Sequence, residues 1–209
     1  MSCPYAAVVR AIISAVAFVA AVPVLAQATD DAPPSAPGLY NLSLQRSGSP
    51  AIHYALYVPR GYSSSTPVPL VLALHYGVRG AEGDGAGRDL LRMLTGPALV
   101  DLGAIIIAPD SLGGDWSTAE NEKAVIALLD DVQARYAIDK AKVAVTGYSM
   151  GGAGTWHFAE KYPQRFSAAI PVAGRPPAPS AGWKMPVLAV HSHDDQVVPF
   201  GPAEARIAE

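Results

Sequence analysis

The chain has 209 residues and a formal net charge of −3, and its composition is 50% hydrophobic but only 16% charged. That length and apolar content can bury one sizeable core, so we expect a single globular domain. The small negative charge argues against nucleic acid or an anionic membrane surface as a partner. Because Cys3 is the only cysteine, an internal disulfide and a cysteine-based zinc site are excluded.

The first 28 residues have the features of a cleavable secretory signal. Arg10 precedes an apolar run over residues 11–22, which is too short to cross a bilayer comfortably. Small residues typical of a cleavage site follow, either Ala-Gln-Ala at residues 26–28 or Val-Leu-Ala at residues 24–26. The alternative is an uncleaved membrane anchor. We expect cleavage, and therefore a secreted or periplasmic protein without a membrane segment in its mature form.

Residues 29–38 contain three prolines and two aspartates, which is typical of a flexible lead-in. We expect the folded domain to cover residues 39–209. Within it, segments typical of strands and helices alternate. Strands are expected over residues 52–58, 70–75, 104–108, 142–146, 167–172 and 186–191.

Three helices are expected between these strands. The first covers residues 90–102 and is interrupted at Gly96-Pro97, the second begins at a capping box over residues 117–120, and the third covers residues 151–162. Strict alternation of strand and helix predicts an α/β fold, with a mostly parallel sheet covered by helices on both faces. Functional side chains are then expected at the carboxyl ends of the strands.

Residues 147–151 form a G-x-S-x-G pentapeptide between an expected strand and an expected helix, centred on Ser149. This strand-turn-helix context is the one that a nucleophilic serine requires. The flanking glycines have no Cβ to collide with neighbouring backbone, so the turn can raise the Ser149 hydroxyl above the sheet. The backbone N–H of Met150, at the start of the helix, is one expected donor to an oxyanion. The alternative is a glycine-rich turn that carries a bystander serine.

A second oxyanion donor is expected near Tyr76, where a buried strand ends in a glycine-rich loop over residues 77–87. Either the backbone or the phenol hydroxyl of Tyr76 could donate, and the alternative is that the ring only packs beneath the loop. His75 is expected to be structural. Two further carboxylates, Asp194 and Asp195, follow the last expected strand, where an acid can orient a catalytic histidine.

Three stretches resemble secreted α/β-hydrolases of the esterase and prolyl-oligopeptidase-like (dienelactone-hydrolase-like) kind: residues 74–77, 143–152 and 191–199. The resemblance implies that Asp195 is the acid, because its spacing to Val198-Pro199 matches the family pattern. Asp194 is expected to be a turn or cap residue. Family members usually have His-Gly where this chain has His75-Tyr76. A tyrosine followed by glycine is similar to the peptidase branch, in which the tyrosine hydroxyl serves the oxyanion.

The resemblance therefore implies a serine hydrolase that cleaves carboxylic esters through an acyl-enzyme on Ser149, with no metal or organic cofactor. One alternative is a serine peptidase or amidase of the prolyl-oligopeptidase type, acting on short peptide substrates. The other is a secreted binding protein that has the hydrolase fold without its chemistry.

In this family the base histidine follows the acid, on a loop beyond one more strand. Residues 196–209 contain no histidine and nothing that would form that last strand and helix. We expect a C-terminally incomplete hydrolase domain that is inactive as it stands. The alternatives are a non-catalytic relative and substitution by another histidine, such as His157. Without a further strand, residues 187–190 would be an exposed apolar sheet edge, through which we expect dimerisation or aggregation.

Overall fold

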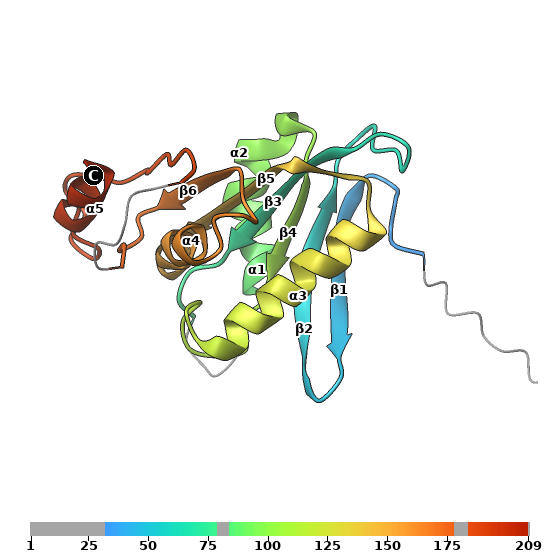
Figure 1. Cartoon of the computed structure of the whole chain (residues 1–209), viewed down its shortest axis with the longest axis horizontal. Coiled ribbons are helices and arrows are strands. Elements are labelled where there is room, and N and C mark those ends of the chain that lie inside the picture. The colour runs from blue at the N-terminus through green and yellow to red at the C-terminus, as the bar shows by residue number, and fades with distance from the viewer. Residues whose placement is uncertain (1–31, 79–83, 178–183, 209) are drawn as a thin grey trace, which may run out of the picture. The chain divides into compact units, whose positions relative to one another are not determined.

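The computed structural model describes residues 32–78, 84–177 and 184–208 (Figure 1). The expected signal over residues 1–28 lies outside these ranges, as does the first part of the lead-in. From Pro33 onward the described residues form one compact unit. Among them, no helix is both long and apolar enough to cross a membrane.

Six strands form one mixed sheet in the order β1-β2-β4-β3-β5-β6 (Figure 1). They are β1 (Gly38–Arg46), β2 (Ser49–Val58), β3 (Val68–Leu74), β4 (Ile105–Pro109), β5 (Ile138–Tyr148) and β6 (Ala168–Val172). β2 runs antiparallel to both of its neighbours, and the other pairs are parallel. The expected α/β fold with a mostly parallel sheet is confirmed.

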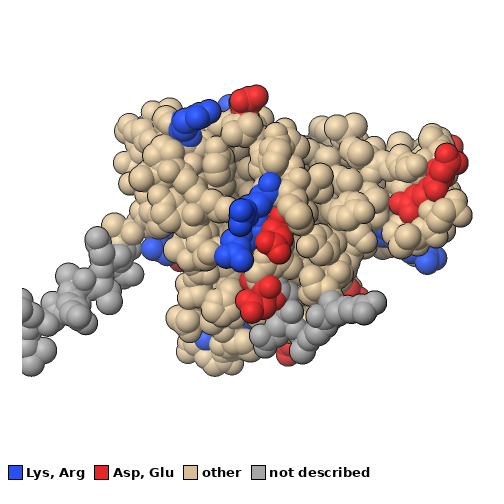
Figure 2. All heavy atoms as spheres, turned by 180° about the vertical axis from the view of Figure 1, so that it is seen from behind, with Lys and Arg blue, Asp and Glu red and all other residues tan. Residues whose placement is uncertain are grey.

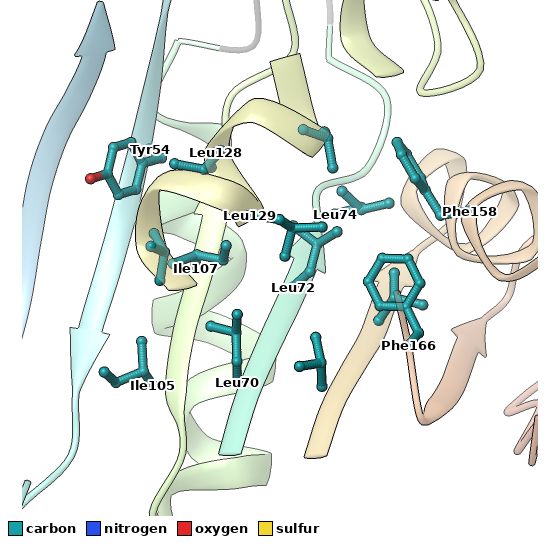
Figure 3. Packing of buried hydrophobic residues seen from close by; sticks show 14 of the residues in the cluster. Tyr54, Leu70, Leu72, Leu74, Ile105, Ile107, Leu128, Leu129, Phe158 and Phe166 are labelled. Carbon is teal, nitrogen blue, oxygen red and sulfur yellow. The ribbon is translucent and has the colours of Figure 1, made fainter. Parts of the chain in front are cut away.

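Helices cover both faces of this sheet. The α-helices of the described residues are α1 (Ala86–Leu90), α2 (Gly96–Leu99), α3 (Ala119–Arg135), α4 (Met150–Lys161) and α5 (Gly201–Ile207), of which α5 lies beyond β6 (Figure 1). Side chains alternate along the central strands, so Leu72 packs with residues of α3 and α4, whereas Val71 packs on the opposite face with Leu90 of α1. Figure 3 shows the face that carries Leu72, where Leu128 and Leu129 of α3 lie by Leu72 and Ile107, and Phe158 of α4 lies near Phe166.

Strand β1 was not expected from the sequence. Its Tyr40, Leu42 and Leu44 alternate with polar residues, and they are only half-buried, at the margin of the core. β1 pairs with β2 through a hairpin whose Gly48 has a φ of 68°. The sheet therefore starts at Gly38, within the segment expected to be a lead-in.

The expected break at Gly96-Pro97 is wrong, because the helical stretch continues through it. A π-helical turn (Leu91–Thr95) joins α1 to α2, and a 3₁₀ turn (Val100–Leu102) follows. Pro97 has no N–H to donate. The π turn just before it moves the pairing by one residue, so that the Gly96 N–H bonds to the Leu91 carbonyl.

The expected capping box over residues 117–120 is displaced by one residue. Helix α3 is capped by Thr118, whose hydroxyl accepts the N–H of Asn121 at 3.3 Å. Asn121 does not complete a box, because its side chain bonds to the loop after β4 instead. It accepts the Leu112 N–H at 2.8 Å and donates to the Asp115 carbonyl at 2.8 Å. This buried amide fixes the loop to the start of α3.

The strand expected over residues 186–191 is reduced to two isolated bridges beside β6. Ala169 and Ala173 donate their N–H groups to the carbonyls of Pro186 and Val190, at 3.1 and 2.8 Å. Pro171, between them, has no N–H with which to make the intervening bond. The ladder is therefore interrupted, although the segment still follows the edge of β6.

Candidate active site

Ser149 stands between β5 and α4 with a strained backbone. Its φ of 56° and ψ of −113° lie outside the regions that residues with a side chain normally adopt. The Ser149 N–H donates to the Val172 carbonyl at the end of β6, at 2.9 Å, which holds the turn in place. Strain of this kind persists where the surrounding structure fixes it, most often at functional sites.

The two glycines of the pentapeptide are required by close backbone contacts. A Cβ on Gly147 would lie 2.7 Å from the Leu74 carbonyl oxygen, and one on Gly151 would lie 2.8 Å from the His75 carbonyl oxygen. Carbon and oxygen atoms do not approach so closely without displacing the backbone. The turn therefore fits against the end of β3 only if both positions are glycine.

The Ser149 hydroxyl is half-buried and makes no hydrogen bond with a described residue. Helix geometry leaves the Met150 N–H without an intrahelical acceptor, since the first N–H groups of a helix have no partner four residues earlier. The Ser149 hydroxyl and the Met150 N–H, neither of which has a hydrogen-bond partner among the described residues, thus belong to adjacent residues. This is the pairing that acyl transfer needs between a nucleophile and an oxyanion donor.

Tyr76 lies on the loop after β3, which reaches the start of α4. A Cβ on Gly77 would be 3.9 Å from the Met150 Cβ, so the two segments are in contact. The Tyr76 ring is half-buried, and its edge meets the Tyr148 ring at a centroid distance of 6.4 Å. Its phenol makes no hydrogen bond with a described residue, so Tyr76 keeps both the packing contact and a free hydroxyl.

His75 is held rigidly beneath this loop. Its Nε2 accepts the Ser111 N–H at 3.0 Å, so the neutral ring carries its proton on Nδ1, which donates to the Tyr76 carbonyl at 2.6 Å. Trp116 donates its indole N–H to the His75 carbonyl at 2.9 Å. Burial lowers the pKa of His75. Both ring nitrogens are used, which leaves none to take a proton from Ser149.

Asp195 is oriented by its own turn. Its Oδ1 accepts the N–H groups of Val197 and Val198, both at 2.9 Å, and these bonds to Val198 and Val197 lower the pKa of Asp195. Its Oδ2 lies 3.5 Å from Nε2 of His191, which also hydrogen-bonds to the Val198 carbonyl at 2.7 Å. By contrast, Asp194 is exposed and its carboxylate has no partner among the described residues.

Ser149 and Asp195 are brought to the same edge of the sheet through β6. Val172 accepts the Ser149 N–H and forms the bridge with Val190, which immediately precedes the segment that carries Asp195. The two residues therefore follow the segments that flank β6 on its two sides, and both segments end at the same edge of the sheet. Asp110, also at a strand end, accepts the N–H groups of Gly85 and Gly87 at 2.9 Å, which gives it a structural role at the start of α1.

All five histidines of the chain lie in the described ranges, and none hydrogen-bonds to Ser149. Besides His75 and His191, they are His53, which is exposed on β2, His157, which bonds to Glu122, and His193, whose ring packs on Phe200. His157 lies eight residues beyond Ser149 on one helix, a rise of about 12 Å. Ser149 therefore has no histidine among its hydrogen-bond partners in the described residues.

A pocket of about 290 Å³ lies over the first turns of α4, between the loops that follow β4 and β6. Its walls include Trp116, Met150 and His157. A second pocket, of about 340 Å³, lies by the edge formed by β1 and β2 and is lined by His53, Arg88 and others. The described residues contain no group of three or more side chains that could hold a metal ion.

A strained serine between a parallel strand and a helix, flanked by glycines at the carboxyl edge of the sheet, defines the class of α/β hydrolases. The comparison with known families agrees with this assignment. The chain belongs to the α/β-hydrolase fold family, which matches residues 83–193.

Two curated relatives are probable feruloyl esterases C. That of Aspergillus niger is 26% identical over 153 residues, and that of Aspergillus terreus is 27% identical over 152 residues. Each alignment covers 70% of this chain and 56% of the relative, so the chain spans about half the length of the curated relatives it matches. A crystal structure of a thermostable esterase superposes with a TM-score of 0.65 at 24% identity, covering 81% of this chain and 50% of that one, and shows the common fold.

Proposed function

We propose that the protein is a serine hydrolase that cleaves carboxylic esters through an acyl-enzyme on Ser149. The observation that carries this proposal is the Ser149 backbone, with a φ of 56° at a turn that only glycine neighbours permit. The curated relatives bear the name of esterases, which favours an ester over a peptide amide as the substrate.

Each residue of the site has a role in this proposal. The Ser149 oxygen attacks the carbonyl carbon, and the developing oxyanion accepts hydrogen bonds from the Met150 N–H and from the backbone or hydroxyl of Tyr76. Asp195 orients an imidazole and stabilises it when it is protonated. The serine proton passes to that base and then to the leaving alcohol, so no cofactor is required.

All five histidines lie in the described ranges and none hydrogen-bonds to Ser149, so we propose that this chain by itself hydrolyses esters only slowly, where the sequence led us to expect no activity. A site that retains its nucleophile turn and oxyanion donors but lacks the base keeps part of its catalysis. Adding free imidazole should then supply a base from solution. The face of the molecule shown in Figure 2 carries few charged side chains, and both signs lie side by side on it.

The test is hydrolysis of p-nitrophenyl acetate by the protein with increasing imidazole. We expect slow turnover that rises with imidazole well beyond the reaction of imidazole alone, and no such rise in Ser149→Ala. Tyr76→Phe distinguishes the two possible donors of Tyr76. A loss of rate would show that the hydroxyl donates to the oxyanion, and an unchanged rate would show that the backbone N–H does. Equal rates for Ser149→Ala and the unmodified protein would refute the proposal, as would faster cleavage of a short peptide p-nitroanilide than of the ester. Strong labelling by a fluorophosphonate without imidazole would show that another base serves.

A further inference from the structure

The pocket over α4 has one wall fixed by close packing. Met150, Ala153, Gly154 and His157 line it from a single face of α4, with the spacing of successive helical turns. A Cβ on Gly154 would lie 2.6 Å from the Trp116 Cβ, so the glycine lets Trp116 pack directly on the helix. Because Met150 follows the nucleophile, the pocket begins beside the site of acyl transfer.

His157, at the far end of this face, is held from behind by Glu122 of α3. The His157 Nε2 lies 2.5 Å from Oε1 of Glu122, and the Lys161 ammonium donates to both oxygens of the same carboxylate, at 2.5 and 2.7 Å. The Glu122 side chain is only 8% exposed. Burial acts to raise the pKa of Glu122, but the hydrogen bonds from Lys161 and His157 outweigh it and lower the pKa.

This contact fixes the proton of the imidazole. An ionised carboxylate only accepts hydrogen bonds, so Nε2 of His157 must be the N–H donor, and the neutral ring has its lone pair at Nδ1. Nδ1 makes no hydrogen bond with a described residue, although the side chain lines the pocket. An acceptor at the end of a partly apolar pocket is suited to a hydroxyl group.

The other polar groups at the pocket agree with a neutral ligand that has hydroxyls. Asp115 and Arg175 carry opposite charges, and Ser117 adds a hydroxyl, already bonded to Asp115 at 2.6 Å. The remaining walls come from Trp116, Met150, Ala153 and two prolines at residues 176 and 177. The set therefore combines flat apolar walls with balanced polar groups, as small-ligand sites do.

We propose that this pocket is a subsite for a hydroxyl-bearing ring of the ester, and that His157 accepts the hydrogen bond of its hydroxyl while Glu122 positions the imidazole. This inference rests on the proposed function, because it assigns the ring to the substrate of Ser149. The ring can belong to the acyl group or to the alcohol, which present the same chemistry to His157. Matched esters distinguish the two sources.

The experiment measures binding in the Ser149→Ala protein, so it does not depend on turnover. One ester pair places the ring on the acyl side, methyl 3-(4-hydroxyphenyl)propanoate and its 4-methyl analogue. The other places it on the alcohol side, 2-(4-hydroxyphenyl)ethyl acetate and its 4-methyl analogue. By titration calorimetry we expect about tenfold tighter binding of the hydroxyl member in one of the two pairs. The pair that shows the preference identifies the side.

His157→Phe should reduce that preference to about one, whereas His157→Gln, which retains an acceptor, should keep part of it. His53→Phe is the matched control, since His53 is exposed on β2 and does not line this pocket, and it should leave the preference unchanged. Thermal melts establish that each variant is folded. If His157→Phe does not fold, the His157→Gln titration and ¹⁵N NMR of the histidine rings carry the test, with the His157 proton expected on Nε2.

Three results would overturn the inference. They are the absence of a hydroxyl preference in both ester pairs, a preference that survives His157→Phe, and a His157 ring that carries its proton on Nδ1. A failure of the proposed function would be seen separately, as missing imidazole-dependent turnover in the unmodified protein. Glu122→Gln should weaken the hydroxyl preference, because a carboxylate then no longer holds Nε2 of His157 as the N–H donor. Loss of a carboxylate with a purely structural role would not change this preference.

Discussion

At the scale of single residues, the site depends on where a Cβ cannot be placed. Ser149 adopts a φ of 56°, while Gly147 and Gly151 lie against the carbonyl groups that end β3. The nucleophile is therefore positioned by backbone contacts and not by hydrogen bonds from its own side chain. Because of these contacts, substitution of either glycine should lower the stability of the fold substantially.

Gly151→Ala should destabilise the protein by about 2–4 kcal/mol, because the added methyl group collides with the backbone at Leu74 and His75. Chemical denaturation monitored by fluorescence measures this difference. Gly201→Ala is the matched control, since a Cβ there would meet nothing within 4 Å. A Gly151→Ala protein as stable as the control would show that the turn is not close-packed.

Glu122 makes a pH-dependent contribution to stability. Because the pKa of folded Glu122 is lowered below its usual value of 4.5, its stabilisation is fully present above that pH and is lost as the pH falls towards the folded pKa. Glu122→Gln should therefore lower stability near neutral pH by about 1–3 kcal/mol. Thermal melts from pH 7 to pH 3 should show the difference from the unmodified protein shrinking below about pH 4.5. A difference that stays constant across this range would contradict the role of the charge.

At the scale of secondary structure, the sequence predicts the elements whose pattern is decided locally. The buried runs of β3 and β4 and the strand-turn-helix around Ser149 are correctly predicted. Burial on both faces requires a continuous apolar run, and a tight turn requires glycine, so both features can be recognised in the sequence. The half-buried β1 was missed, since its alternating Tyr40, Leu42 and Leu44 follow a proline-rich stretch. The cap of α3 was displaced because Ser117 and Thr118 are adjacent and both able to cap.

The contacts that join distant segments could not be predicted from the pattern. Glu122 is a charged residue in the first turn of α3, where acidic residues are common on solvent-facing positions. Only the packing of α3 beside α4 turns it inward to His157 and Lys161. The roles of Asp110 and Asn121 in holding loops likewise depend on partners that the strand order brings together.

The interrupted ladder beside β6 yields a prediction at this scale. Pro171→Val should restore the missing N–H and let it donate to the Leu188 carbonyl, because Ala169 and Ala173 already donate to this segment. Hydrogen exchange should then find the amide of residue 171 protected to a degree similar to that of residue 173. Fast exchange at residue 171 would mean that the proline is not the cause of the interruption.

At the scale of the whole molecule, the outer edge of the sheet is the feature with the widest consequence. Beyond β6, the segment over residues 186–190 has no strand on its outer side within the described residues. Leu188 is 65% exposed and Val190 is 48% exposed. An edge with free backbone groups and apolar side chains favours pairing with another chain.

We therefore expect the 209-residue chain to self-associate through this edge, with dimers or larger species in sedimentation velocity at micromolar concentrations. Leu188→Lys should shift the distribution towards monomer, since a lysine on an edge strand opposes pairing through charge. Met93→Lys is the matched control, because Met93 is also 65% exposed but lies on the helical turn between α1 and α2. Only a substitution at the edge should matter if strand pairing holds the copies together. Equal effects of the two lysines would indicate general apolar association, and a monomeric unmodified chain would show that the edge is already protected.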